Sequence, residues 1–241
     1  MSFYPFFFII YKKCRYMNRL TEIANKHNTD KGTNSNCDNH CQGHGFTEFY
    51  YNYFKDLRHP IILEIGVWKG ASIKMYNEFF NGDCEIYCID IDPNRDVSNL
   101  GDNVHFFVVD QGDINQLNAF KEKMGDIKFD IILDDGSHQI FHQMLTYAVF
   151  RKLLKPDGIY VMEDLHTSFL ESWGRSYGNE KTTTLDFFVG FVPFEKFTNE
   201  LNMELLNEIK TVELFSNDNN SYGSNIRKNR SLTAIIKLKH E

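Results

Sequence analysis

From residue 60 onward, short runs of Ile, Val, Phe and Tyr alternate with longer stretches in which apolar residues recur at helical spacing. This alternation is typical of a parallel sheet with helices on both faces. The sequence KPDG at 155–158 is expected to end the last intervening helix and lead into a strand. The predicted helices lie near 70–80, 113–124 and 138–154. The predicted strands are 61–67, 85–91, 103–110, 129–135 and 158–164.

The last part of the chain departs from this alternation. A helix is predicted around 183–209, and two strands follow at 211–216 and 232–239 with a turn-rich segment but no helix between them. Two successive strands without an intervening helix form an antiparallel pair. We therefore expect an α/β fold of the Rossmann-like, doubly wound class, with a seven-stranded mixed sheet whose last pair is antiparallel. Residues 25–241 are predicted to form one domain, preceded by an extension at 1–24.

The N-terminal segment MSFYPFFFIIYKKCRY contains an apolar run too short to span a bilayer, and it lacks the flanks of a signal peptide. No transmembrane segment is therefore expected. Three interpretations of residues 1–16 remain open: a weakly ordered extension, an annotation artefact that precedes a true start at Met17, or a peripheral anchor with Lys12, Lys13 and Arg15 behind its aromatic run. The aromatic residues could also pack against a second copy of the chain in a homo-oligomer.

Composition and charge exclude some classes of partner. The 241 residues are 42% hydrophobic and 24% charged, which is ordinary for a globular domain. A net charge of −7 offers no broad attraction to nucleic acid. Five cysteines, an odd and scattered set, indicate a reducing, cytoplasmic setting. Cys37, His40, Cys41 and His44 could in principle bind zinc, but their spacing matches no standard finger.

The ends of the first three predicted strands carry residues suited to a nucleotide-like ligand. Gly66 permits a tight turn after the first strand, and Gly70 opens the next helix, but the pattern is not GxGxxG. The acidic Glu64 argues against a pyrophosphate and favours a cationic or zwitterionic ligand. A carboxylate after the second strand, such as Asp90, can hold ribose hydroxyls. Asp110 and Gln111, after the third strand, are candidates to meet an adenine ring.

The fourth and fifth strands end in carboxylates. Asp135 follows the fourth strand, and Glu163 and Asp164 follow the fifth, so the three should converge at one edge of the sheet. Carboxylates brought together in this way need a cation, and an all-oxygen set favours Mg²⁺. His138 begins the next helix, where an imidazole can take a proton from a hydroxyl acidified by the metal ion. Asp134 is assigned to the cofactor side.

Two resemblances follow from these motifs. Glu64, Gly66, Asp90 and Asp110, in this order, resemble the successive motifs of class I S-adenosylmethionine-dependent methyltransferases over about residues 60–165. DDGSH at 134–138 and EDLHTS at 163–168 resemble the metal-dependent sugar O-methyltransferases of macrolide biosynthesis, over roughly residues 25–240.

The second resemblance implies a function and roles for individual residues. It implies methyl transfer from S-adenosylmethionine to a hydroxyl of a sugar or another glycosylated small molecule or glycan. Asp135, Glu163 and Asp164 would hold Mg²⁺, and His138 would be the general base. The TDKG segment would fold over the cofactor, so that Asp30 and Lys31 touch its amino-acid end.

Other interpretations stay open at this point. An NAD-dependent oxidoreductase on the same fold is one rival, although the glycine pattern disfavours it. A non-catalytic binding protein that retains the fold is another. The polar, aromatic segment 166–184 could be a substrate lid or a surface excursion. If it is a lid, its candidates for contact with the methyl acceptor are His166, Trp173, Arg175 and Tyr177.

Overall fold

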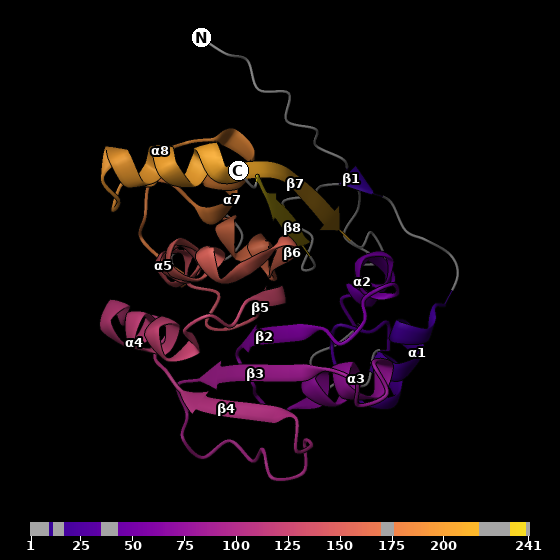
Figure 1. Cartoon of the computed structure of the whole chain (residues 1–241). Helices are drawn as coiled ribbons and strands as arrows, with labels where there is room; N and C mark the ends of the chain where they lie inside the picture. Colours follow the sequence, from indigo (N-terminus) through magenta and orange to yellow (C-terminus); the bar gives the residue numbers. More distant parts are fainter. Residues whose placement is uncertain (1–9, 12–16, 35–42, 170–175, 217–231, 240–241) are drawn as a thin grey trace.

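One mixed sheet organises the protein, in the strand order β1-β7-β8-β6-β5-β2-β3-β4 (Figure 1). The computed structural model describes residues 10–11, 17–34, 43–169, 176–216 and 232–239. Strands β6, β5, β2, β3 and β4 run parallel, and β8 is antiparallel to both β6 and β7. The strands are β1 (Ile10–Tyr11), β2 (Ile61–Ile65), β3 (Glu85–Asp90), β4 (Val104–Val108), β5 (Phe129–Asp134), β6 (Leu154–Met162), β7 (Ile209–Ser216) and β8 (Leu232–Leu238).

The seven predicted strands and the antiparallel last pair are therefore confirmed. The two-residue strand β1, which pairs in parallel with β7, was not predicted. It lies in the N-terminal extension, where two residues give too short a pattern to read. The rest of residues 1–16 and the turn-rich segment 217–231 lie outside the described residues.

Helices cover both faces of the sheet, as the alternation predicts (Figure 1). Apolar side chains of α1, α2 and α3 form the core on one face. Those of α4, α5, α7 and α8 form the core on the other face. Within the described residues, no helix is long and apolar enough to cross a membrane. The α-helices are α1 (Arg19–Lys26), α2 (Thr47–Phe54), α3 (Ala71–Phe79), α4 (Ile114–Met124), α5 (Ile140–Phe150), α7 (Thr184–Gly190) and α8 (Asn199–Glu208).

Two local predictions were wrong. The helix expected over 183–209 is two helices, α7 and α8, because Pro193 follows the end of α7 and cannot continue a helix. KPDG does not separate helix from strand. A 3-10 turn at Arg151–Leu153 ends α5, and KPDG lies inside β6, where the register against β5 shifts between Phe129 and Ile131. Such an irregularity accommodates a proline within a sheet.

The helix α1 matters for the site because it begins the segment that reaches the sheet edge. Asn18 caps it by accepting a hydrogen bond from the backbone N–H of Thr21. Leu20 and Ala24 are fully buried against the neighbouring helices. The chain then passes through Thr29–Gly32 to α2, and this passage crosses the carboxyl ends of the parallel strands.

Candidate active site

A cavity of about 1060 Å³ lies at the carboxyl ends of the parallel strands. Open α/β sheets bind their ligands at this edge. Four predicted site residues do not line the cavity: Glu64, Gly70, Asp134 and Glu163. The predicted site residues that do line it are Asp30, Lys31, Gly66, Asp90, Asp110, Gln111, Asp135, His138 and Asp164. The sheet topology therefore brings most of the candidates together at the cavity, and the other four lie outside its lining.

The loop after β2 approaches the end of β5 with no room for a side chain. Gly66 has a left-handed backbone (φ +93°), and a Cβ there would overlap the carbonyl of Asp135. The backbone N–H of Asp135 also donates to the carbonyl of Ile65 at 2.9 Å. Gly70, with φ +70°, begins α3 and faces the side chain of Leu100 instead of the cavity. The two glycines thus have different tasks: close approach of backbones, and helix entry.

Asp90 organises this loop. Its Oδ2 accepts hydrogen bonds from the backbone N–H of Val67 (2.9 Å) and of Trp68 (3.3 Å), and its Oδ1 accepts one from Asp92 N–H at 2.9 Å. Arg95 Nε lies 3.0 Å from Oδ2. Burial by itself raises the pKa of Asp90, but these donors outweigh it and hold the pKa below its ordinary value. Asp90 is therefore ionised and fixed at the cavity wall.

Gln111 reaches the cavity because Asp134 holds it from behind. Its Nε2 donates to Asp134 Oδ1 at 2.8 Å, and its Oε1 accepts from the backbone N–H of Ser137 at 2.9 Å. Asp134 is only 1% exposed, and burial raises its pKa to about 7. Asp110 lines the cavity and accepts a hydrogen bond from the backbone N–H of Gly112 at 2.8 Å. Asp134 thus orients a cavity residue and does not face the cavity itself.

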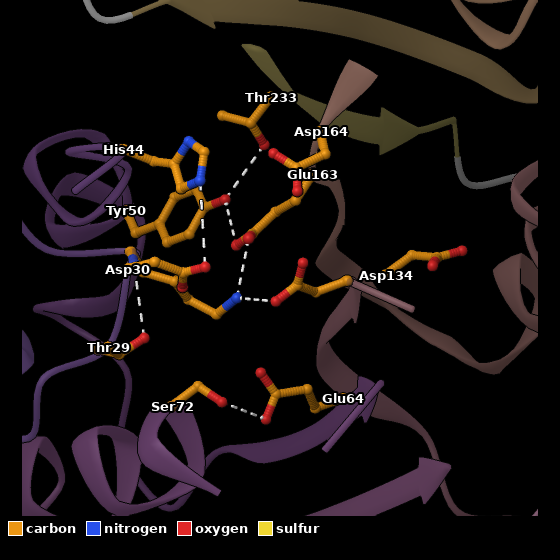
Figure 2. A network of polar contacts seen from close by, with 12 residues as sticks. Thr29, Asp30, His44, Tyr50, Glu64, Ser72, Asp134, Glu163, Asp164 and Thr233 are labelled. Carbon is orange, nitrogen blue, oxygen red and sulfur yellow. Dashed lines mark hydrogen bonds and ion pairs between the residues drawn. The ribbon is translucent and has the colours of Figure 1, made fainter. Parts of the chain in front are cut away.

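Glu64 does not line the cavity and lies beside Ser72 (Figure 2). Its Oε2 accepts a hydrogen bond from Ser72 Oγ at 2.9 Å, and its Oε1 has no hydrogen-bond partner among the described residues. The side chain is fully buried, and burial raises its pKa to about 7, against the opposing influence of Lys31 and Ser72. A carboxyl group in this position adds to the negative character of the site when it is ionised.

Lys31 places a buried ammonium group among the predicted metal ligands. Its side chain is 1% exposed, and its Nζ forms ion pairs with Asp135 Oδ2 and, at 2.8 Å, with Glu163 Oε2. Burial by itself would lower the pKa of Lys31, but the two carboxylates outweigh it and raise the pKa well above its ordinary value. Lys31 is thus charged. Asp30, the neighbouring residue, is half-exposed at the cavity, and its Oδ2 lies 4.0 Å from His44 Nε2.

The remaining oxygen of Glu163 is also engaged. Its Oε1 accepts a hydrogen bond from the hydroxyl of Tyr50 at 2.8 Å, and that hydroxyl lies 3.1 Å from Thr233 Oγ1 (Figure 2). Burial raises the pKa of Glu163 well above its ordinary value, although Lys31 opposes this shift. Both oxygens of Glu163 therefore have donors, and Glu163 is not among the residues that line the cavity with Asp135 and Asp164.

Asp164 and His138 face each other across the cavity floor. His138 Nε2 lies 3.4 Å from Asp164 Oδ2, and His166 Nδ1 lies 3.6 Å from Asp164 Oδ1. Burial by itself raises the pKa of Asp164, but the nearby imidazoles of His138, His44 and His166 outweigh it and hold the pKa below its ordinary value. The Oδ1 atom of Asp164 is buried without a hydrogen-bond partner among the described residues. A bound ion or water is one explanation for a buried polar atom without a hydrogen bond.

The residues at this end of the cavity fit a divalent cation. One ligand atom each from Asp135, His138 and Asp164 can lie within 4.8 Å of one another. Carboxylate oxygens suit Mg²⁺, and the Oδ1 atom of Asp164 accepts no hydrogen bond from the described residues that would compete with it. The cluster differs from the predicted set in containing His138 in place of Glu163, because Glu163 is held by Lys31 and Tyr50. Asp135 and Asp164 belong to both sets.

Some cavity residues were not predicted from the sequence. Trp68 has a left-handed backbone (φ +48°), is 66% exposed, and has the guanidinium of Arg95 at 5.2 Å from its ring centre. Ile91 also lines the cavity and is 62% exposed. The local signal was present: a large apolar residue one or two positions after a strand-end glycine or aspartate, where strands meet ligands.

Of the predicted acceptor contacts that the structure describes, Tyr177 lies beside His138 and His166 lies beside Asp164. The ring centre of Tyr177 lies 6.4 Å from that of His138, and the Tyr177 carbonyl accepts a hydrogen bond from the backbone N–H of Ile140 at 2.9 Å. His166 is buried beside Asp164. Trp173 and Arg175 lie outside the described residues, as do Cys37, His40 and Cys41 of the considered zinc cluster.

Comparison with known proteins agrees with this fold. Residues 63–165 match a family of methyltransferase domains. Mycinamicin VI 2''-O-methyltransferase of Micromonospora griseorubida is 34% identical over 140 residues, which are 54% of this chain and 34% of that protein. A tetracenomycin-C rhamnosyl 2'-O-methyltransferase of Streptomyces olivaceus is 31% identical over 154 residues, 60% of this chain and 39% of that protein. The resemblance predicted from the two acidic motifs is confirmed.

A solved structure shows the same fold over nearly the whole chain. The methyltransferase MycE of the mycinamycin biosynthetic pathway, in complex with Mg and SAH, superposes with a TM-score of 0.62 at 23% sequence identity. The match covers 93% of this chain and 56% of that protein. The present chain therefore corresponds to only part of these relatives, and spans about a third to two fifths of the two curated proteins.

Proposed function

We propose that this protein methylates a hydroxyl of a sugar or glycosylated small molecule, because residues 63–165 match a methyltransferase domain and the chain is similar to sugar O-methyltransferases. The methyl donor is S-adenosylmethionine, and the required cation is Mg²⁺. The observation that carries the proposal is the placement of His138, Asp135 and Asp164 at one end of a cavity whose other wall is the glycine loop at Gly66.

The cavity offers separate surfaces for the parts of the methyl donor. The backbone at Gly66 leaves open main chain against which the amino-acid portion can lie. Asp90, Ile91 and Gln111 line the region suited to a nucleoside, with carboxylate, apolar and amide groups in turn. Asp30 adds a carboxylate that can pair with the ammonium of the donor. A methyl donor bound in this orientation has its sulfonium methyl group toward the acidic end of the cavity.

Methyl transfer then needs an aligned, deprotonated acceptor oxygen. The oxygen attacks the methyl carbon in line as the carbon–sulfur bond breaks, the methyl ether forms, and S-adenosylhomocysteine leaves. His138 takes the hydroxyl proton and later releases it to water. Asp164 stabilises the resulting imidazolium from 3.4 Å. A bound Mg²⁺ supplies the acidity that makes the hydroxyl easier to deprotonate.

Tyr177 lies near the proposed base. Its ring centre is 6.4 Å from that of His138, and its carbonyl accepts a hydrogen bond from the backbone N–H of Ile140. An aromatic ring at this place also suits the apolar face of a sugar. Holding the acceptor between this ring and the acidic cluster would contribute alignment, which supplies much of the rate enhancement in such displacements.

Calorimetric titration of the purified protein with S-adenosylmethionine, in Mg²⁺ and again in EDTA, tests the proposal against its rivals. We expect binding of S-adenosylmethionine and no binding of NAD⁺, which would be the ligand of an oxidoreductase. Titration with Mg²⁺ should give a signal that Asp164→Asn removes, while the exposed substitution Glu122→Gln leaves it unchanged. Absence of S-adenosylmethionine binding in both buffers would overturn the proposal.

Binding alone does not separate an enzyme from a non-catalytic protein that retains the fold. The second measurement is therefore transfer of a labelled methyl group from S-adenosylmethionine to a panel of rhamnosides and other glycosides, with a catechol as the non-sugar acceptor. Transfer to glycosides that depends on Mg²⁺ and on His138 supports the proposed activity. Binding without transfer to any member of the panel would favour the non-catalytic alternative.

A further inference from the structure

The ammonium group of Lys31 lies among the carboxylates at the end of the cavity. This group touches two of the three clustered carboxylates, those of Asp135 and Glu163, and the lysine side chain is 1% exposed. A lysine buried this deeply is retained only when its charge is paired. Removing either charge from such a cluster leaves the other uncompensated, so the lysine and the carboxylates depend on one another.

The backbone around Lys31 fixes the ammonium group at this position. The carbonyl of Lys31 accepts hydrogen bonds from the backbone N–H of Thr47 at 3.0 Å and from Thr47 Oγ1 at 3.2 Å. Tyr50, one turn along α2, donates to Glu163. The segment between α1 and α2 is thus anchored to Glu163, after β6, through Lys31, and α2 is anchored to it through Tyr50, although more than a hundred residues separate them in sequence.

We propose that Lys31 is an exchangeable internal cation, which holds Asp135 and Glu163 together in the metal-free protein and competes with the divalent ion for their oxygens. The inference rests on the proposed function only in taking a divalent ion as the competitor. The incoming ion is received by Asp164 and Asp135. The Oδ1 atom of Asp164 has no hydrogen-bond partner among the described residues, and Asp135 lines the cavity. Glu163 becomes available to it only when the Lys31 ammonium withdraws.

Two consequences follow from charge. Without Lys31, the carboxylates of Asp135 and Glu163 lose the ammonium group that they share, so the metal-free protein should lose stability. The same loss removes a positive charge from the vicinity of the incoming ion, so the affinity for Mg²⁺ should rise. If Lys31 served only as a fixed structural partner, its removal would lower the stability equally with and without Mg²⁺.

The test compares Lys31→Met with Lys74→Met, which removes a cation that lines the same cavity without an ion pair to Asp135 or Glu163. Mg²⁺ affinity is measured by calorimetry, and melting temperature is measured in EDTA and in saturating Mg²⁺. We expect Lys31→Met to bind Mg²⁺ at least about tenfold more tightly than the wild type. Its melting temperature should fall in EDTA and recover most of the loss in Mg²⁺, whereas Lys74→Met should change both quantities much less.

Equal or weaker Mg²⁺ binding by Lys31→Met, or an equal loss of melting temperature with and without Mg²⁺, would overturn the proposal. If Lys31→Met does not fold, amine labelling of the wild-type protein read by mass spectrometry takes its place: Lys31 should be protected in EDTA and react faster in Mg²⁺, and an unchanged rate would overturn the proposal. Titration of the same samples with S-adenosylmethionine reports separately on the proposed function.

Discussion

His138 Nε2 lies 3.4 Å from Asp164 Oδ2, and both residues have left-handed backbones, with φ of +58° and +55°. Non-glycine residues in this conformation cost roughly 1–3 kcal/mol each and persist where the surroundings hold them. Thr167 supplies part of that hold, since its hydroxyl donates to the carbonyl of His138 at 3.3 Å and to that of Asp164 at 2.8 Å. Two strained turns are thereby tied together so that an imidazole and a carboxylate meet.

His138→Asn should abolish most of the methyl transfer and leave the fold intact. Asparagine tolerates a left-handed backbone but cannot serve as the base, so we expect kcat to fall by about 10²- to 10⁴-fold. S-adenosylmethionine affinity and melting temperature should stay close to those of the wild type. His138→Ala is the matched comparison, because it removes the same imidazole but tolerates φ +58° less well and should also lower the melting temperature. Retention of more than a tenth of kcat by His138→Asn would exclude His138 as the general base.

Thr167→Val tests the tie between the two turns. Valine has nearly the shape of threonine but donates no hydrogen bond, so the carbonyls of His138 and Asp164 lose their shared donor. We expect a decrease in kcat of about tenfold and a loss of unfolding free energy of about 1 kcal/mol. The KM for S-adenosylmethionine should change little. Thr167→Ser, which keeps the hydroxyl, should restore most of the activity, and failure of that rescue would mean that packing of the methyl group matters more than the hydrogen bonds.

Gly66→Ala should destabilise the protein and prevent cofactor binding. The backbone has φ +93°, and the new Cβ would overlap the backbone of Asp135, so the ends of β2 and β5 must move apart. Gly125→Ala is the control, because Gly125 also has a positive φ, +56°, but a Cβ there meets nothing within 4 Å. The control therefore shows the cost of a positive φ without a steric overlap. Thermal unfolding and S-adenosylmethionine titration of the pair should differ clearly, and equal behaviour would mean that the close approach at Gly66 can relax.

The sequence predicted the elements of the site better than the directions of its side chains. Parallel strands must bring Asp135 and Asp164 to one edge, and the alternation of apolar runs was enough to place both residues there. Successive residues at a strand end, however, point to opposite sides. Asp134 consequently lies behind Gln111 while Asp135 lines the cavity, and Glu163 points to Tyr50 while its neighbour faces His138.

The contact between Lys31 and the acidic motifs could not have been found from local pattern. Lys31 lies 104 residues from Asp135 and 132 from Glu163, and nothing in the periodicity of TDKG specifies which carboxylates its side chain reaches. Similarity to a family indicated that this segment folds over the site. The position of its ammonium group depends on the packing of α1 and α2 against the sheet edge, which is a property of the assembled fold.

Stability should depend on pH through two buried carboxyl groups that lie behind the cavity. Burial raises the folded-state pKa of Glu64 to about 7 from an ordinary value of 4.5, with Lys31 and Ser72 opposing the shift. Burial likewise raises that of Asp134 to about 7 from 3.8. Since both folded-state values exceed the unfolded ones, the stability that these groups contribute is fully present below the unfolded pKa values and is lost as the pH rises through about 7.

Glu64→Gln should therefore stabilise the protein above pH 7 and flatten its stability profile between about pH 4.5 and 7. Glutamine carries no charge to bury, and its amide oxygen can still accept the hydrogen bond from Ser72 that Glu64 accepts at 2.9 Å. A pKa shift of this size corresponds to at most about 3 kcal/mol. Urea unfolding at pH 5, 6, 7 and 8 measures the profile, with the exposed substitution Glu122→Gln as the control. A Glu64→Gln protein that is less stable than the wild type at pH 8, with an unchanged slope, would show that the Glu64 carboxylate is needed in its ionised form.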